Sequence, residues 1–366
     1  MTIPARFIVL LFAVLAIAVI VVSLPDRSGF PVTEKRERRE EPAPPAEPTP
    51  AELALQAEVI RLGSEFAGEA GLAVQDVATG KTFAHDGDGI YPQQSVSKLW
   101  VAIAALHEVD EGRLELAEMV TLRRDDLTVF HQPIRNIVNA RGAFATDYAD
   151  LIERALTQSD NTANDRILRR VGGPEAVQAF IDKAELAGIR FGTDERTKQS
   201  AIAGLAWRQS YSYRDWFFKA RDALPDDLRR QAFEAYLAEP MDGATPLGLA
   251  DALARLARGE LLSEPSTRLL LATLERTKSG PNRLKAGAPA GWSVAHKTGT
   301  GQVFDGEHTG YNDVAILTAP DGRQYAVVAM IRRTRSSYAA RMEMMQALSR
   351  AVGQYHDAAY RAAAEP

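Results

Sequence analysis

The chain has 366 residues, 46% of them hydrophobic, and a formal net charge of −5 at neutral pH. A chain of this length can bury a large core, either in one domain or in two layers with a cleft between them. The negative net charge gives no sign of a basic surface that would bind nucleic acid. The sequence has no cysteine, which excludes a thiol nucleophile, disulfides and cysteine-ligated metals. The six histidines never occur as H-x-H or H-E-x-x-H, so the pattern supports neither a metal nor another cofactor.

The first 50 residues are predicted to export the chain and to tether it. An almost uninterrupted apolar run at 7–24 follows Arg6, and a run of this length is enough to span a bilayer. Because no convincing A-x-A site follows, we expect residues 1–24 to be a transmembrane anchor in the inner membrane, with a cleaved signal peptide as the alternative. In both cases the rest of the chain is exported to the periplasm. Residues 25–50 combine a charge run with many prolines, which predicts an extended linker.

The folded domain is expected from residue 51, where the apolar pattern predicts a helix over 51–66. Runs of β composition occur at 70–76, 81–85, 291–298, 313–320 and 324–331. Turn residues at 78–80 and 320–322 predict hairpins that join the first two and the last two runs. The chain between 95 and 286 is mostly helical in pattern, and an amphipathic helix is expected over 336–355.

These elements predict an α/β (α+β) fold. Two early strands cannot form a stable sheet alone, and the three late strands lack partners on one side. We therefore expect a five-stranded antiparallel sheet with the N- and C-terminal helices on one face and an all-helical lobe inserted between strands two and three. Residues 51–94 and 287–366 would form the α/β lobe and residues 95–286 the helical lobe. A cleft between the lobes is the natural place for a site.

The first candidate site is Ser95-Val96-Ser97-Lys98, which precedes a long apolar run. Residues three apart share one face of a helix, so a helix beginning here would place the Ser95 hydroxyl beside the Lys98 amine. A serine needs an adjacent base to act as a nucleophile, and a buried lysine gives up its proton more easily. The alternative is that Ser95 only caps the helix and Lys98 extends to solvent. This pattern alone is weak.

Two further motifs follow. Ser159-Asp160-Asn161 interrupts a helical pattern with residues that favour turns, and it would place a hydroxyl and an amide at a loop facing the cleft; a simple helix-ending turn is the alternative. Lys297-Thr298-Gly299-Thr300 ends a predicted strand. There, Gly299 would let a substrate approach the backbone closely, beside a cation and two hydroxyl donors. A similar triplet, Lys278-Ser279-Gly280, lies in a loop context without a strand edge, and we reject it as a functional element.

In this order, S-x-x-K, S-D-N and K-T-G are the signature of class A β-lactamases and penicillin-binding proteins. From about residue 51 to 357 the chain resembles a class A serine β-lactamase, the family of penicillin-interacting serine hydrolases. The resemblance includes the runs SDNTANDRILRRVGGPEAV, ATPLGLADALARLARGELLS and PNRLKAGAPAGWSVAHKTG. It implies a monomer whose 51–366 domain carries the activity.

The resemblance also implies a role for each motif. Ser95 would be the acylated nucleophile and Lys98 a general base, while Ser159 would pass a proton to the leaving nitrogen. Substrate binding would fall to Asn161, Lys297, Thr298 and Thr300, the first through the side-chain amide and the others through the carboxylate. The backbone N–H groups of Ser95 and Thr300 would form the oxyanion hole.

One part of the family pattern is missing. Class A enzymes hydrolyse the acyl-enzyme with a Glu in an E-x-x-L-N loop, and the family spacing leads to Glu195, where no such loop sequence occurs. An extra helical, aromatic-rich segment at 206–240 ends with Glu239, which is a second candidate for the deacylation base. For each of them, an exposed Glu before a helix or turn is the alternative.

Three functions remain open at this point. The first is a β-lactamase, which forms a covalent acyl-enzyme with a β-lactam and then hydrolyses it. The second is a D-Ala-D-Ala peptidase or penicillin-binding cell-wall hydrolase, which acts on peptidoglycan stem peptides and deacylates slowly. The third is a membrane-tethered sensor of penicillin or peptidoglycan with weak catalysis.

Overall fold

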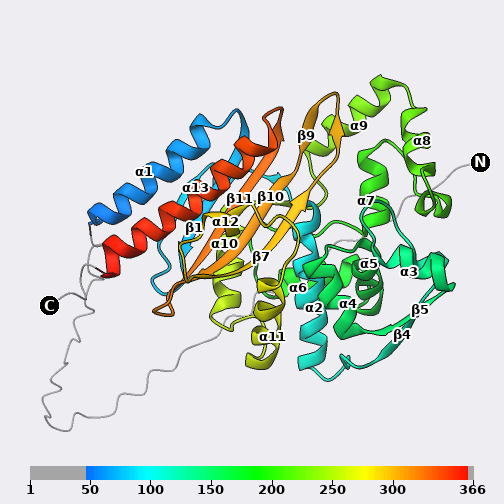
Figure 1. Cartoon of the computed structure of the whole chain (residues 1–366), viewed down its shortest axis with the longest axis horizontal. Helices are drawn as coiled ribbons and strands as arrows, with labels where there is room; N and C mark the ends of the chain where they lie inside the picture. The colour runs from blue at the N-terminus through cyan, green and yellow to red at the C-terminus, as the bar shows by residue number, and fades with distance from the viewer. Residues whose placement is uncertain (1–46, 362–366) are drawn as a thin grey trace, which may run out of the picture. The chain divides into compact units, whose positions relative to one another are not determined.

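The computed structural model of the protein describes residues 47–361 (Figure 1). The predicted anchor at 1–24 and nearly all of the predicted linker at 25–50 lie outside the described residues. Within the described part, no helix is both long enough and apolar enough to cross a membrane.

An antiparallel sheet forms the centre of the fold. Its main path runs in the order β2 (Thr82–His85), β1 (Gly68–Asp76), β11 (Gln324–Thr334), β10 (Tyr311–Thr318) and β7 (Ser293–Thr300). The predicted five-stranded sheet is confirmed, and the structure adds two short strands, β8 (Val303–Phe304) and β9 (Glu307–Thr309), the second of which pairs with β11. Asp305 and Gly306 between them have positive φ angles of 49° and 72°, as a two-residue hairpin turn requires.

The two terminal helices, α1 (Pro50–Glu65) and α13 (Tyr338–His356), cover one face of the sheet (Figure 1). Because strand side chains alternate between faces, Leu72 and Val74 of β1 join the core beneath these helices, whereas Ala73 joins the core on the other side. Thr49 caps α1 and forms a capping box with Glu52, which explains why the helix begins at the end of the proline-rich run.

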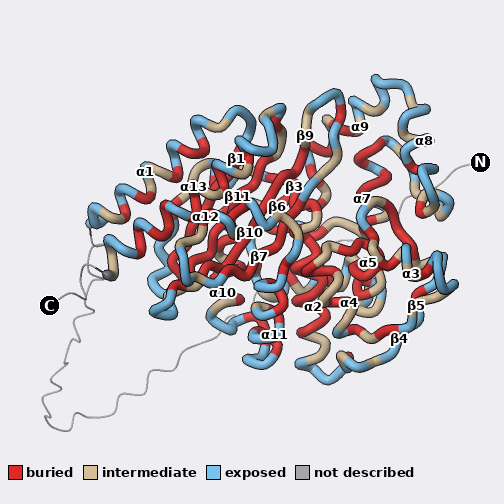
Figure 2. Tube along the Cα trace, in the orientation of Figure 1, coloured by how far each residue is buried: buried red, intermediate tan, exposed pale blue. Residues whose placement is uncertain are grey.

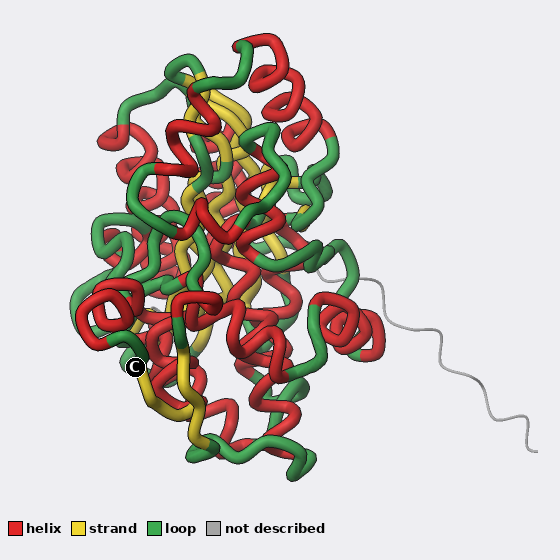
Figure 3. The backbone as a smooth tube through the Cα atoms, turned by 90° about the vertical axis from the view of Figure 1, so that its right-hand side faces the viewer, coloured by secondary structure: helices red, strands yellow, loops and turns green. Residues whose placement is uncertain are grey.

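The opposite face is covered by α10 (Pro246–Ala257), and Figure 3 shows the strands between layers of helices. The larger core continues from there into the inserted lobe, where every residue of 99–106 in α2 (Lys98–Asp110) is buried. A helix that is apolar all round belongs in the middle of a lobe, and Figure 2 shows much of α2 buried. This helix carries the first motif into the interior.

The inserted lobe consists mostly of helices. Besides α2 these are α3 (Ile134–Arg141), α4 (Tyr148–Thr157), α5 (Asn161–Arg170), α6 (Pro174–Lys183), α7 (Glu195–Ile202), α8 (Trp216–Asp222), α9 (Asp226–Ala238), α11 (Glu264–Glu275) and α12 (Leu284–Gly287), with short 3₁₀ turns η1 (Gln94–Ser97), η2 (Arg124–Asp126) and η3 (Gln209–Ser212). A π-turn, η4 (Asp357–Arg361), follows α13.

The lobe also contains strands that the expected all-helical arrangement lacks. β4 (Met119–Leu122) pairs with β5 (Phe144–Asp147), while β6 (Gly243–Ala244) pairs with β3 (Tyr91–Pro92), which precedes the lobe in the sequence. These runs have only two to four residues each, which is too short for an alternating pattern to distinguish them from loops.

Candidate active site

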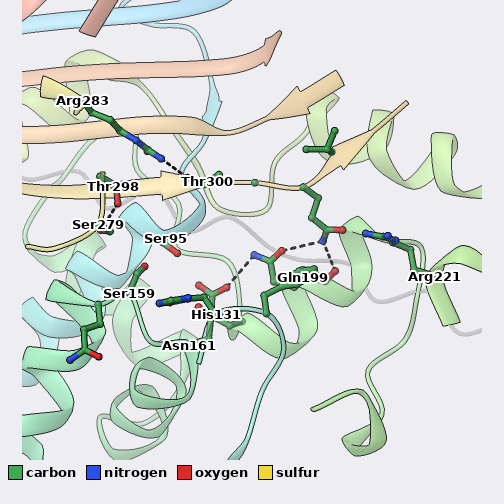
Figure 4. A pocket seen from close by; sticks show the side chains of 16 residues that line it. Ser95, His131, Ser159, Asn161, Gln199, Arg221, Ser279, Arg283, Thr298 and Thr300 are labelled. Carbon is green, nitrogen blue, oxygen red and sulfur yellow. Dashed lines mark hydrogen bonds between the residues drawn. The ribbon is translucent and has the colours of Figure 1, made fainter. Parts of the chain in front are cut away.

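A cavity of about 560 Å³ lies where β7 meets the inserted lobe, and six of the predicted site residues line it. They are Ser95, Ser159, Asn161, Glu195, Thr298 and Thr300. In the view of Figure 4, Thr298 and Thr300 lie on the strand above, Ser159 and Asn161 lie below, and Ser95 lies between them. Segments that are far apart in the sequence therefore meet at one pocket, as the motif order predicted.

The S-x-x-K pair sits at the start of α2. Ser95 belongs to the 3₁₀ turn η1, and Lys98 is the first residue of the helix. The Lys98 side chain is fully buried, and its Nζ donates a hydrogen bond to Ser95 Oγ at 2.8 Å. Burial lowers the pKa of Lys98, because a charged amine is costly without water. The hydroxyl thus has a proton acceptor within reach.

A second hydroxyl–amine pair faces the first. Ser159 lies in the turn between α4 and α5 with a φ of +58°, and Lys297 Nζ donates to its Oγ at 3.1 Å. Burial, followed by the nearby charges of Lys98 and Arg283, lowers the pKa of Lys297. The strained backbone aims the Ser159 side chain into the pocket, which is a common feature of active sites.

The middle residue of the S-D-N motif, Asp160, has a structural role. Asp160 is fully buried and caps α5 by accepting hydrogen bonds from the backbone N–H groups of Thr162 and Ala163 at 2.9 and 3.0 Å. It also accepts from the N–H of Ile134 at 2.8 Å. Asn161 then begins the helix, and its amide donates to the Val129 carbonyl at 2.9 Å. The loop before α3 is therefore tied to the motif.

The K-T-G strand forms one wall of the pocket, because β7 is the last strand on the main path of the sheet. Gly299 packs against the turn before Ser95, where an added Cβ would lie 2.4 Å from the Gln93 carbonyl oxygen. We expected this glycine to admit a substrate, and the structure shows the chain's own backbone in close approach. The small residue lets the strand and the Ser95 turn meet.

Two residues of this wall were missed by the sequence reasoning. Arg283 donates to Thr300 Oγ1 at 2.6 Å and to the Gly299 carbonyl at 2.9 Å, and it lines the pocket. Ser279, from the triplet that we rejected, lines the pocket too and shares a hydrogen bond with Thr298 Oγ1 at 2.7 Å. Arg283 stands in no motif, so only the tertiary fold reveals it, whereas the rejection of Ser279 for its loop context was wrong because that loop folds against the strand wall.

The two candidate deacylation carboxylates have opposite environments. Glu195 is the first residue of α7, its side chain is 2% exposed, and its Oε1 accepts from Lys98 Nζ at 2.7 Å. Glu239 is 81% exposed and pairs with Arg190 at 3.4 Å, and it does not line the pocket. The structure thus brings Glu195 to the Ser95–Lys98 pair and leaves Glu239 at the surface.

The charge of Glu195 is set by its neighbours. Burial alone would raise its pKa, but the positive charge of Lys198 and the hydrogen bonds from Lys198 and Lys98 hold the pKa of Glu195 well below its usual value. Lys198 and Gln199 stand where the E-x-x-L-N pattern has Leu and Asn, and both contact Glu195, at 3.1 and 3.2 Å. Spacing from Glu195 is the signal that could have identified them.

A serine beside a buried lysine, a second serine beside a second lysine, and a buried carboxylate define an acyl-transferring serine hydrolase. Within residues 47–361, no group of three or more acidic or histidine side chains could hold a metal ion. The family model described as Beta-lactamase enzyme family matches residues 54–356. The chain belongs to this family, and the predicted relationship to class A serine β-lactamases is confirmed.

Known proteins are similar to this chain in both sequence and fold. The extended-spectrum β-lactamase PER-1 of Pseudomonas aeruginosa is 29% identical over 68% of this chain and 69% of its own length. A β-lactamase of Amycolatopsis lactamdurans is 28% identical over 80% and 82%. The crystal structure of a β-lactamase from Chitinophaga pinensis DSM 2588 superposes with a TM-score of 0.66 and 26% identity, covering 83% of this chain and 99% of that one.

Proposed function

We propose that this protein hydrolyses β-lactams through a covalent acyl-enzyme on Ser95. The observation that carries the proposal is the chain of contacts from Ser95 Oγ to Lys98 Nζ at 2.8 Å and on to Glu195 Oε1 at 2.7 Å. It joins a nucleophile, a buried amine and a buried carboxylate, which supports acylation and hydrolysis at one centre.

In the acylation step, Lys98 accepts the hydroxyl proton and Ser95 Oγ bonds to the β-lactam carbonyl carbon. The backbone N–H groups of Ser95 and Thr300 bind the developing oxyanion, where fixed donors contribute most to catalysis. The ring C–N bond then breaks, the leaving nitrogen takes a proton from the hydroxyl of Ser159, and the proton that Lys98 took from Ser95 returns to Ser159. Lys297 Nζ donates a hydrogen bond to that hydroxyl oxygen at 3.1 Å, and this bond stabilises the oxygen while its proton moves to the nitrogen.

Substrate binding is assigned to the strand wall and to α5. Lys297, Thr298 and Thr300 would hold the substrate carboxylate, with Arg283 adding a guanidinium that already contacts the Thr300 hydroxyl. Arginine suits this task because its donors match a carboxylate geometrically. Asn161 would bind the amide of the acyl side chain across the pocket.

In the deacylation step, Glu195 takes a proton from water and the water oxygen bonds to the ester carbonyl carbon. The Ser95 oxygen leaves with a proton from Lys98, which regains one from Glu195 along the 2.8 Å and 2.7 Å contacts. The low pKa of Glu195 keeps the carboxylate ionised at neutral pH, which is the form that a general base needs. Its place beside Lys98 supports a hydrolase over a slowly deacylating peptidase or a sensor. The exposed Glu239 has no part in this scheme.

We also propose that the domain is exported and held at the outer face of the inner membrane. The support is the apolar run at 7–24 together with the proline-rich 25–50 linker. The domain would act as a monomer. Membrane fractionation of the full chain tests the anchor, and release of the domain into the soluble fraction of the periplasm would contradict it.

The experiment that tests the function follows penicillin hydrolysis and intact protein mass together. Multiple turnovers with a short-lived adduct are the expected result, and Ser95→Ala should form no adduct. A long-lived adduct with little hydrolysis would support the peptidase or sensor instead. Absence of any adduct on the wild-type protein would overturn the proposal.

A further inference from the structure

A third buried lysine, Lys198, lies beside the Ser95 turn, and the mechanism above does not use it. Lys198 is one helical turn after Glu195 on α7, and its side chain is 1% exposed. Its Nζ lies 3.1 Å from Glu195 Oε1 and 3.5 Å from Asp242 Oδ2. It also donates to the Gln94 carbonyl at 3.3 Å and to Ser97 Oγ at 3.2 Å, so it contacts both ends of the 94–97 turn.

A fully buried lysine is costly unless it is paired and hydrogen-bonded. The second carboxylate that pairs with it, Asp242, comes from the chain just after the 206–240 segment. Asp242 is fully buried and accepts from the Gln94 N–H and from the Tyr236 hydroxyl, both at 2.8 Å. The additional segment thus ends in a counter-charge that makes a lysine possible where the family pattern has leucine.

The charges around Lys98 and Lys198 come from every element packed there. The titratable groups are Glu195 on α7, Asp165 on α5, Tyr236 on α9, Asp242 before β6 and Lys297 on β7. Although burial opposes it, the carboxylates of Glu195 and Asp242 raise the pKa of Lys198, whereas burial lowers the pKa of Lys98. Of the two lysines that contact Glu195, Lys198 is therefore the one that holds its proton.

We propose that Lys198 is a positioning residue that supplies the counter-charge for Glu195 and so leaves Lys98 free to accept the Ser95 proton. Without Lys198, Glu195 would keep Lys98 as its only lysine partner, and an adjacent anion favours the protonated amine. Lys98 would then enter the reaction already protonated at neutral pH. The inference rests on the proposed function, because it concerns the base of the acylation step.

The test is the pH dependence of the acylation rate, measured on the full chain by stopped flow with a chromogenic cephalosporin. In the wild type the rate rises with pH and levels off once Lys98 is neutral. Lys198→Met should move the midpoint of that rise upward by about one pH unit or more, which makes acylation about tenfold slower on the rising limb and nearly unchanged at the plateau. Lys198→Arg, which retains the charge, should restore the wild-type midpoint.

Lys219→Met is the matched control, because it removes one positive charge from an exposed side chain paired with Asp215. Its profile should equal that of the wild type. An unshifted midpoint in Lys198→Met, or a uniform loss of rate at every pH, would overturn the inference, whereas a wild type that forms no adduct would overturn the proposed function itself. If Lys198→Met does not fold, Lys198→Gln decides, because it removes the charge and keeps a hydrogen-bond donor: the midpoint should again rise, and an unchanged or lowered one contradicts the inference.

Discussion

The buried carboxylate of Asp165 makes the stability of the protein depend on pH. Its side chain is fully buried on α5, and Oδ1 accepts from the Glu195 N–H at 3.1 Å and from the Asn164 amide at 3.2 Å. Oδ2 has no hydrogen-bond partner among the described residues and lies 4.0 Å from Arg196 Nε. Asp165→Asn is nearly isosteric, and its amide oxygen can keep both accepted bonds.

The magnitude follows from proton linkage. Burial, followed by the carboxylates of Asp194 and Glu195, raises the pKa of Asp165 from 3.8 to about 7. Because the folded state holds this proton more tightly than the unfolded chain, the free energy of unfolding falls as pH rises from about 4 to 7. Three pKa units correspond to about 4 kcal/mol. Asp165→Asn should therefore be more stable than the wild type by about 4 kcal/mol at pH 8 and by little at pH 4.

Urea unfolding from pH 4 to 8.5 measures this difference. Asp226→Asn is the control, because its carboxylate is 84% exposed and should leave the curve unchanged. Parallel curves for the wild type and Asp165→Asn, or a variant that is less stable at every pH, would refute the reasoning.

Three further predictions concern catalysis. Glu195→Gln should slow deacylation by about 10²- to 10⁴-fold and trap the adduct, seen by intact mass, whereas Glu239→Gln should turn over normally; trapping by the second variant alone would contradict the assignment. Arg283→Met should lower kcat/KM by about tenfold or more through loss of a charge-assisted hydrogen bond, and equal steady-state kinetics would exclude that role. Gly299→Ala should reduce stability by about 1–3 kcal/mol and slow acylation, because its Cβ meets Gln93; an unchanged melting temperature and acylation rate would contradict this.

Local patterns predicted the framework well. The β composition of the runs at 70–76 and 324–331 identified β1 and β11, because apolar and β-branched side chains pack well on a sheet. The i, i+3 spacing of Ser95 and Lys98 placed the hydroxyl beside the amine. These features depend on residues that are close together in the sequence, so one sequence is enough to predict them. The hairpin of β8 and β9 was missed although its Asp305-Gly306 pair is a recognised turn signal.

The contacts that tune the site depend on residues far apart in the sequence. Lys198 and Asp242 are separated by two helices, and each alone reads as an ordinary surface charge. Arg283 reaches the hydroxyl of Thr300 across 17 residues of sequence. No periodicity or motif predicts these side-chain contacts, because they form only when separate elements pack together.

The central claim is that one serine at the meeting point of the two lobes carries the acyl group. Rapid quenching of the full chain after mixing with an equal amount of penicillin, followed by peptide mapping, tests it most directly. We predict a penicilloyl adduct on Ser95 that appears within the first turnover and then decays as free penicilloic acid accumulates. Hydrolysis without any adduct, or an adduct on another residue, would contradict the account.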